Sequence, residues 1–295
     1  MRNILIIVFF TFFNKVSAQD SSIYFFKNRY NQNTLQKIEQ SRLDFKEIKI
    51  LLGYMIDPKR QEVADYKRVK KSLETLFPNA NQEGVLCIDW ENKLYQNIRG
   101  NNITRIKSVS NKEYLKGEKE FINLIKFIKK LRPNVKVGIF EMPFRVYSNS
   151  EIIKNTNQKL DPILKHVDII FPCIYIPFPA KVKSIQSNYD FLKINLDLAF
   201  NYGDRLKKPV IPFVWYLYYS PDNTYRKELI PKDELWEYIK YIESYKSSSN
   251  KRVSGIVWWD TPTSYSKTLI RNTFIDDYNK KDQTINDVFS YYFDL

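Results

Sequence analysis

Short apolar runs rich in β-branched and aromatic residues alternate along this chain with longer stretches whose apolar residues recur at helical spacing. The short runs predict buried strands, because a strand covered on both faces carries few polar residues. They span residues 23–26, 48–54, 85–90, 135–140, 167–175, 210–218 and 253–259. The longer stretches predict helices over residues 63–77, 110–132, 152–164, 184–201, 233–246 and 263–281.

Strands that alternate with helices predict a parallel sheet. About seven such units favour an α/β fold closed into a TIM-like (β/α) barrel, distorted and with about seven parallel strands. An open, doubly wound sheet is the alternative, but no glycine-rich first turn supports it. No low-complexity linker interrupts residues 19–295, which we expect to form a single domain.

The first 18 residues have the pattern of a secretory signal peptide. Arg2 precedes an apolar run from Ile4 to Phe13, and small residues lead up to Ala18. No later run approaches the roughly 20 apolar residues that a transmembrane helix needs. We therefore expect a secreted or extracytoplasmic protein without a membrane span, cleaved near Ala18.

The chain is basic, with a formal net charge of +14. Removal of residues 1–18 takes away Arg2 and Lys15 and no acid, which leaves +12. Such an excess favours an anionic partner, and an acidic polysaccharide is our expectation. A solvated basic surface is the alternative. Nucleic acid is not expected, because the lysines are dispersed and no recognition module is visible. The oligomeric state stays open.

Several residue types are too rare for common kinds of site. Cys87 and Cys173 both lie in apolar runs and are expected to be small buried hydrophobes, although a single bridge between them is an alternative. His166 is the only histidine. A metal site of the usual zinc composition is therefore not expected, and with no phosphate loop we expect no cofactor.

Two carboxylates follow the apolar strand over residues 85–90. Residues two apart on a strand point to the same face, so Asp89 and Glu91 should project side by side. Neighbouring carboxyl groups favour one ionised and one protonated group, and the protonated group can act as a general acid. The alternative is a solvated strand end without catalytic function.

Aromatic and acidic residues gather at the ends of the predicted strands, where the active site of such a barrel lies. Sugar rings stack on aromatic planes, and acids act on the glycosidic oxygen. The alternative is that these aromatic residues belong to the core. The candidate substrate-binding residues are Tyr54, Trp90, Glu141, Tyr175, Trp215, Tyr216 and Trp259.

Six segments resemble hyaluronidases, glycoside hydrolase family 56, and they occur in the order of that family over roughly residues 48–270. Asp89-Trp90-Glu91 is similar to the family's Ile-Asp-Trp-Glu catalytic segment. The others are Gly138-Ile139-Phe140-Glu141-Met142-Pro143, Phe171-Pro172-Cys173-Ile174-Tyr175-Ile176-Pro177, Pro209-Val210-Ile211-Pro212-Phe213-Val214, Leu229-Ile230-Pro231-Lys232-Asp233-Glu234-Leu235 and Gly255-Ile256-Val257-Trp258-Trp259.

The resemblance implies a secreted glycosidase that cleaves β-linked N-acetylhexosamine in a glycosaminoglycan of the hyaluronan or chondroitin type. Its mechanism is retaining and substrate-assisted. The resemblance assigns Glu91 as the general acid and base, and Asp89 as the group that orients the acetamido N–H. It also implies that Tyr54 and Trp259 line the sugar subsite.

The chain departs from the family pattern at three positions. Phe171 and Phe213 stand where the family has tyrosines, and Glu141 stands where it has glycine. Tyr175, Tyr216 or Tyr218 could supply a replacement hydroxyl. Two alternatives stay open: a non-catalytic protein that binds acidic polysaccharide, and a glycosidase acting on a neutral N-acetylglucosamine polymer.

Overall fold

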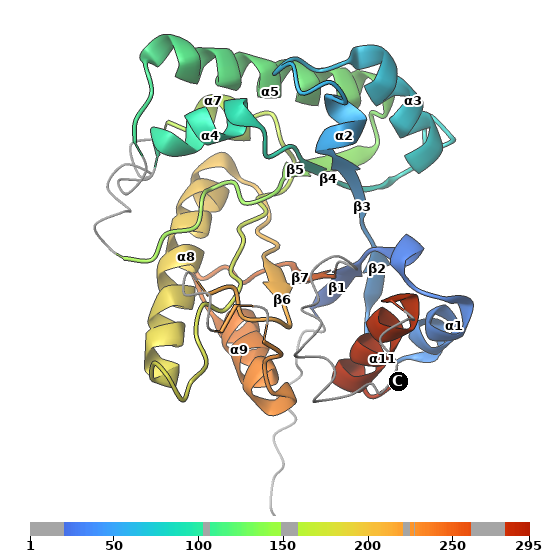
Figure 1. Ribbon diagram of the computed structural model, residues 1–295, viewed down its shortest axis with the longest axis vertical. Coiled ribbons are helices and arrows are strands. Elements are labelled where there is room, and N and C mark those ends of the chain that lie inside the picture. Colours follow the sequence, from blue (N-terminus) through green and yellow to red (C-terminus); the bar gives the residue numbers. More distant parts are fainter. Residues whose placement is uncertain (1–20, 103–106, 149–158, 221–224, 227, 261–280) are drawn as a thin grey trace, which may run out of the picture.

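The computed structural model describes residues 21–102, 107–148, 159–220, 225–226, 228–260 and 281–295, and these form an α/β fold with two parallel sheets (Figure 1). One sheet has the strand order β3-β4-β5 and the other β2-β1-β7-β6. All strand pairs in both sheets are parallel, as the alternation of strands and helices predicts. The strands are β1 (Ser22–Phe25), β2 (Phe45–Glu47), β3 (Lys49–Leu52), β4 (Gly84–Asp89), β5 (Val135–Ile139), β6 (Phe213–Trp215) and β7 (Gly255–Trp259).

The two sheets do not close into the continuous barrel that the sequence predicts. On one side only Ile48 separates β2 from β3, so the chain passes from one sheet to the other between Glu47 and Lys49. On the other side, residues 167–175 form no strand and contact their neighbours through isolated bridges such as Phe140–Phe171 and Cys173–Phe213. Proline has no N–H to donate, so Pro172 and Pro212 interrupt the ladders at this point.

Helices cover both sheets, and most follow the predicted spacing. The long helix α5 (Asn111–Leu131) begins at a capping box in which Ser110 and Glu113 bind each other's backbone N–H groups. The other α-helices are α1 (Gln32–Gln40), α2 (Gly53–Ile56), α3 (Tyr66–Leu76), α4 (Lys93–Gly100), α7 (Asp161–Leu164), α8 (Ile185–Leu206), α9 (Lys232–Ser244) and α11 (Lys281–Phe293), with a short 3-10 helix, η1 (Lys27–Arg29). The helices α1, α2, α4 and α11 are additions to those predicted, and α2 begins within the strand predicted over residues 48–54.

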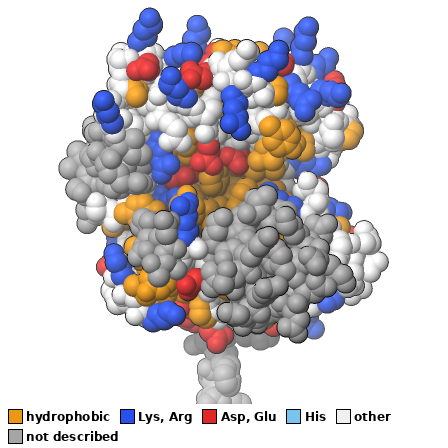
Figure 2. All heavy atoms as spheres, in the orientation of Figure 1, with side chains coloured by type: hydrophobic (Ala, Val, Ile, Leu, Met, Phe, Trp, Pro, Cys, Tyr) orange, Lys and Arg blue, Asp and Glu red, His pale blue; other side chains and the backbone are white. Residues whose placement is uncertain are grey.

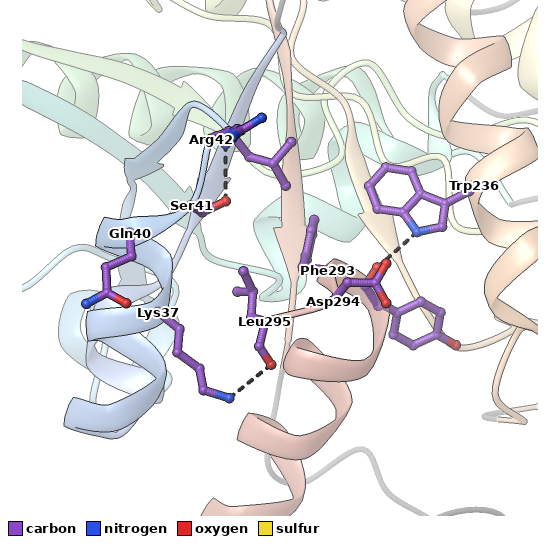
Figure 3. Close-up of a pocket in the computed structure, with 10 residues that line it drawn as sticks. Lys37, Gln40, Ser41, Arg42, Trp236, Phe293, Asp294 and Leu295 are labelled. Atoms are coloured by element: carbon purple, nitrogen blue, oxygen red, sulfur yellow. Dashed lines mark hydrogen bonds between the residues drawn. The ribbon is translucent and has the colours of Figure 1, made fainter.

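The C-terminal helix α11 completes the core of the four-stranded half. The ring of Phe289 packs against Phe45, and Phe293 lies 4.7 Å from Trp258, ring centre to ring centre. Beside it, a groove of about 600 Å³ lies between α1, α9 and the C-terminus (Figure 3). There Lys37 Nζ donates a hydrogen bond to the Leu295 carbonyl oxygen at 2.9 Å.

The remaining predictions have mixed outcomes. Cys87 and Cys173 are free and buried, so they are small buried side chains and no bridge joins them. No helix of the described ranges is long and apolar enough to cross a membrane. The signal peptide predicted at 1–18 and most of the helix predicted at 263–281 lie outside the described residues, as does much of the helix predicted at 152–164.

Candidate active site

Asp89 is the last residue of β4, where it pairs in register with Leu52 of β3. The chain then leaves the sheet, and the Asn92 side chain caps α4 by accepting a hydrogen bond from Tyr95 N at 3.1 Å. Glu91 is therefore fixed between a strand end and a helix start. Both carboxylates line a cleft of about 800 Å³ that extends over the ends of β3 and β4. Figure 2 shows acidic side chains gathered in a hollow between the two halves of the molecule, with hydrophobic side chains below them.

Burial and neighbouring charges affect the pKa values of Asp89 and Glu91 differently. Partial withdrawal from water raises the pKa of Glu91 to about 7, and the negative charges of Asp89 and Glu141 act in the same direction. Loss of water also raises the pKa of Asp89, but a hydrogen bond with Glu91 and the positive charge of Arg29 oppose that rise. The arrangement therefore favours a protonated Glu91 beside an ionised Asp89.

A third carboxylate lies beneath the cleft. Glu141 is buried, and its Oε1 lies 3.3 Å from Arg99 Nη2 and 3.6 Å from Arg145 Nη2. Arg145 is itself buried, and one of its Nη atoms lies 3.2 Å from the Cys173 sulfur. Buried charges need partners of opposite sign, and these two ion pairs supply them.

Aromatic side chains from both sheets form the apolar part of the site. Trp259, at the end of β7, lies 5.9 Å from Phe140 and 5.9 Å from Phe213, ring centre to ring centre. The guanidinium of Arg29 lies 4.6 Å from the centre of the same indole ring. Trp259 is half-buried, so part of its surface is accessible to a ligand.

The three tyrosines considered as replacement donors differ in what their hydroxyls do. The Tyr216 hydroxyl donates to Asp260 Oδ1 at 2.7 Å, and the Tyr218 hydroxyl donates to Glu234 Oε1 at 2.8 Å. The Tyr175 hydroxyl is buried and has no hydrogen-bond partner among the described residues, and it lies close enough to Asp89 for the two groups to interact electrostatically. Of the three, Tyr175 is the one with a hydroxyl left to donate.

The candidate substrate-binding residues predicted from the sequence differ in how far they are exposed. Tyr54 is 58% exposed at the rim of the cleft. Trp90 is 2% exposed and packs on Phe121 of α5, as the alternation of side chains along a strand dictates. Trp215 is buried beside Tyr175, with ring centres 5.3 Å apart.

Tyr216 lies deeper than the other candidates. It has no exposed surface and stacks on Trp258 at 5.4 Å, on the side of β7 that faces α11. Its place is in the core of the four-stranded half. The structure thus puts Tyr54 at the rim of the cleft and leaves part of Trp259 exposed, whereas Trp90 lines the cleft with almost no exposed surface and Tyr216 lies in the core.

Three arginines of the site were missed by sequence reasoning: Arg29, Arg99 and Arg145. Arg29 ends η1, Arg99 is on α4 and Arg145 follows β5. No local pattern connects them, although Arg145 follows Glu141 by four residues. Their common position could be found only in three dimensions.

Neither a protein-family model nor a curated protein matches this chain. Among solved structures, bee venom hyaluronidase aligns with a TM-score of 0.62 at 14% identity, over 93% of this chain and 97% of that chain. The same enzyme in complex with a hyaluronic acid tetramer aligns with a TM-score of 0.59 at 14% identity, over 92% of this chain and 95% of that chain. At this identity the likeness shows a shared fold.

Proposed function

We propose that the protein is a glycoside hydrolase that cleaves β-linked N-acetylhexosamine bonds in a glycosaminoglycan of the hyaluronan or chondroitin type. The observation that carries the proposal is the neighbouring carboxyl pair at the open end of β4, where burial and the charges of Asp89 and Glu141 raise the pKa of Glu91. The fold supports it, since bee venom hyaluronidase has the same architecture and binds a hyaluronic acid tetramer.

The proposed reaction uses the acetamido group of the substrate as the nucleophile. The acetamido oxygen attacks the anomeric carbon, the glycosidic C–O bond breaks, and the leaving oxygen takes the proton of Glu91. Asp89 accepts a hydrogen bond from the acetamido N–H and stabilises the positive charge that develops on the ring formed. Glu91, now ionised, removes a proton from water as the water attacks the anomeric carbon. The bond between that carbon and the acetamido oxygen breaks, the acetamido group re-forms, and Glu91 and Asp89 return to their starting state.

The surroundings of the pair fit a sugar polymer that carries negative charge. Trp259 and Tyr54 offer aromatic surface for sugar rings, and the buried Tyr175 hydroxyl offers a hydrogen-bond donor near Asp89. Arg60 and Lys93 line the same cleft together with Asp57 and Glu62, and Lys93 Nζ lies 3.6 Å from Glu62 Oε1. The positive charge that favours an acidic polymer is therefore that of the whole chain, +14.

Release of reducing ends from hyaluronan, chondroitin and chitin oligosaccharides tests the proposal. The protein and its Glu91→Gln variant are compared between about pH 4 and pH 7, where a raised carboxyl pKa permits acid catalysis. We expect cleavage of hyaluronan or chondroitin, and a loss of about 10³-fold in kcat for Glu91→Gln with binding retained.

Other outcomes select the alternatives. Cleavage of chitin oligosaccharides alone would assign a neutral polymer as the substrate. Binding of hyaluronan or chondroitin without cleavage by either protein would contradict the hydrolase and leave a polysaccharide-binding protein. Phe171 and Phe213, both fully buried where the related motif has tyrosines, are the feature that favours this second function.

A further inference from the structure

Glu141 is held between two arginines in a part of the molecule that almost no water reaches. Its side chain is 3% exposed, that of Arg145 is 4% exposed and that of Arg99 is 15% exposed. Both guanidinium groups approach the same carboxylate oxygen, at 3.3 Å and 3.6 Å. The three side chains carry a combined charge of +1, because one carboxylate faces two guanidinium groups.

The backbone at Glu141 is strained in a way that a glycine would relieve. Its φ angle is +52°, in the left-handed region where Cβ approaches the following carbonyl oxygen, so any residue other than glycine is disfavoured. The hyaluronidase motif that this segment resembles has a glycine here. At Glu141 this conformation is combined with burial of the carboxylate against two arginines.

The positive charges of the two arginines oppose the protonated form of Glu91. Their positive charges both act on Glu91 and favour its ionised form, whereas Asp89 and Glu141 favour its protonated form. The ion pairs lie near Glu91 in the fold, because β4 and β5 are paired as far as Ile88 and Ile139 and the chain reaches Glu91 and Glu141 three and two residues later. A nearby positive charge favours the ionised form of a carboxyl group. An acid beside two uncompensated guanidinium groups would thus lose the proton that it must donate.

We propose that Glu141 is a positioning residue that neutralises one of the two guanidinium charges and so allows Glu91 to keep its proton. The catalytic meaning of this role rests on the function proposed for Glu91. In this arrangement Arg145 and Arg99 hold Glu141 in place, and Glu141 offsets their effect on the acid. It acts on the substrate only through Glu91.

Of the other titratable groups that act on Glu91, Asp89 favours the same protonated form. Asp89 precedes it by two residues, and its charge is in part offset by Arg29. Tyr95 on α4, Cys87 on β4 and Cys173 also interact with Glu91, but burial raises the pKa of each, so all three stay neutral. Glu141 is the group among these that remains to oppose Arg99 and Arg145.

Direct titration of Glu91 tests the proposal without substrate. Carboxyl resonances of protein labelled with ¹³C at the glutamate side-chain carboxyl are followed against pH by NMR, and the Glu91 signal is assigned by its absence in Glu91→Gln. We expect the midpoint of Glu91 to fall by about one pH unit or more in Glu141→Gln. In the double variant Glu141→Gln/Arg99→Gln the midpoint should return towards that of the parent, because one charge of each sign has been removed.

Glu234→Gln is the matched control, since it removes a partly buried glutamate on α9 that binds Tyr218 and Tyr238. The Glu91 midpoint should not move in this variant. If Glu141→Gln fails to fold by near-ultraviolet circular dichroism, Arg99→Gln is used alone, and the midpoint should rise. An unchanged midpoint in folded Glu141→Gln, or in folded Arg99→Gln, would overturn the proposal.

The titration separates this inference from the proposed function. If the protein cleaves no polymer but Glu91 shows the expected midpoints, the role of Glu141 is supported and the proposed hydrolase activity is contradicted. If the protein cleaves hyaluronan but the midpoint does not move, the hydrolase activity is supported and the role of Glu141 is contradicted. In an active enzyme, the alkaline limb of kcat against pH should move to lower pH in Glu141→Gln, which a purely structural role would not cause.

Discussion

The two halves of the molecule contribute different properties to the site. The half built on β3, β4 and β5 supplies Asp89, Glu91 and the ion pairs of Glu141. The half built on β2, β1, β7 and β6 supplies Trp259 and, behind it, the ring stack of Tyr216, Trp258 and Tyr292. Most of the charged groups belong to the first half, which also supplies Tyr54, and the second half supplies Trp259 together with Arg29. Substitutions in the first should therefore change kcat, and those in the second should change KM or stability.

The largest expected effect of this comparison is at Asp89. Asp89→Asn keeps the shape of the side chain but removes the charge that stabilises the reaction intermediate. We expect kcat to fall by about 10²- to 10³-fold, with KM little changed, in steady-state assays on the cleaved polymer. Asp57→Asn is the control, because Asp57 lines the same cleft but binds the backbone N–H groups of Gln61 and Glu62. Equal losses of kcat in the two variants would argue against a specific role for Asp89.

A smaller effect is expected in the aromatic half. Trp259→Ala removes the half-buried indole, so we expect KM to rise about tenfold with kcat changed less. Trp259→Phe should retain much of the binding, because a ring remains. A fall in kcat at constant KM would show that Trp259 serves the chemical step and would break the division between the halves.

Tyr216 should matter for stability alone. Tyr216→Phe leaves the buried Asp260 with one hydrogen bond fewer, which we expect to cost about 2 kcal/mol of unfolding free energy. Thermal or denaturant unfolding measures the loss, and kinetic constants measured well below Tm should not change. A raised KM in a stable protein would instead place Tyr216 in contact with substrate.

The last effect is a pH-dependent stability difference at Glu91. The folded state binds the Glu91 proton more tightly than the unfolded chain does, since the pKa rises from 4.5 to about 7 on folding. Ionisation of Glu91 therefore disfavours the folded state, and this cost grows as pH rises from 4.5 to 7 and is complete above it. Glu91→Gln cannot ionise, so its Tm should exceed that of the parent above pH 7 and match it below about pH 4. A Tm difference that is constant with pH would contradict the raised pKa.

Much of the fold was predictable because its local patterns agree with its tertiary contacts. The apolar run before Asp89 is β4, and the helical spacing over residues 110–132 is α5. The strand predicted over 167–175 is only a set of isolated bridges, because Pro172 interrupts a run that is otherwise apolar enough for a strand. Helix α11 was not predicted, although its buried residues recur at helical spacing: Ile285, Val288, Phe289 and Tyr292.

The candidate site was predictable in part for the same reason. Period-two alternation was enough to place Asp89 and Glu91 side by side and also implied that Trp90 points elsewhere. Exposure was harder to predict, because Tyr54 and Tyr216 both follow apolar runs but end up on the surface and in the core. Burial depends on which elements pack over a residue, and α11 covers Tyr216 from the far end of the chain.

The sequence by itself determined the parallel strands, most of the helices and the two adjacent carboxylates, because these depend on residues within a few positions of one another. Only the tertiary structure decided that the sheets stay open, that the Tyr175 hydroxyl is left without a partner and that three arginines surround the acids. Hydration and Coulomb interactions depend on distance in space, and Arg29, Arg99 and Arg145 meet there from separate parts of the chain. The proton affinity of Glu91 is therefore a property of the folded molecule.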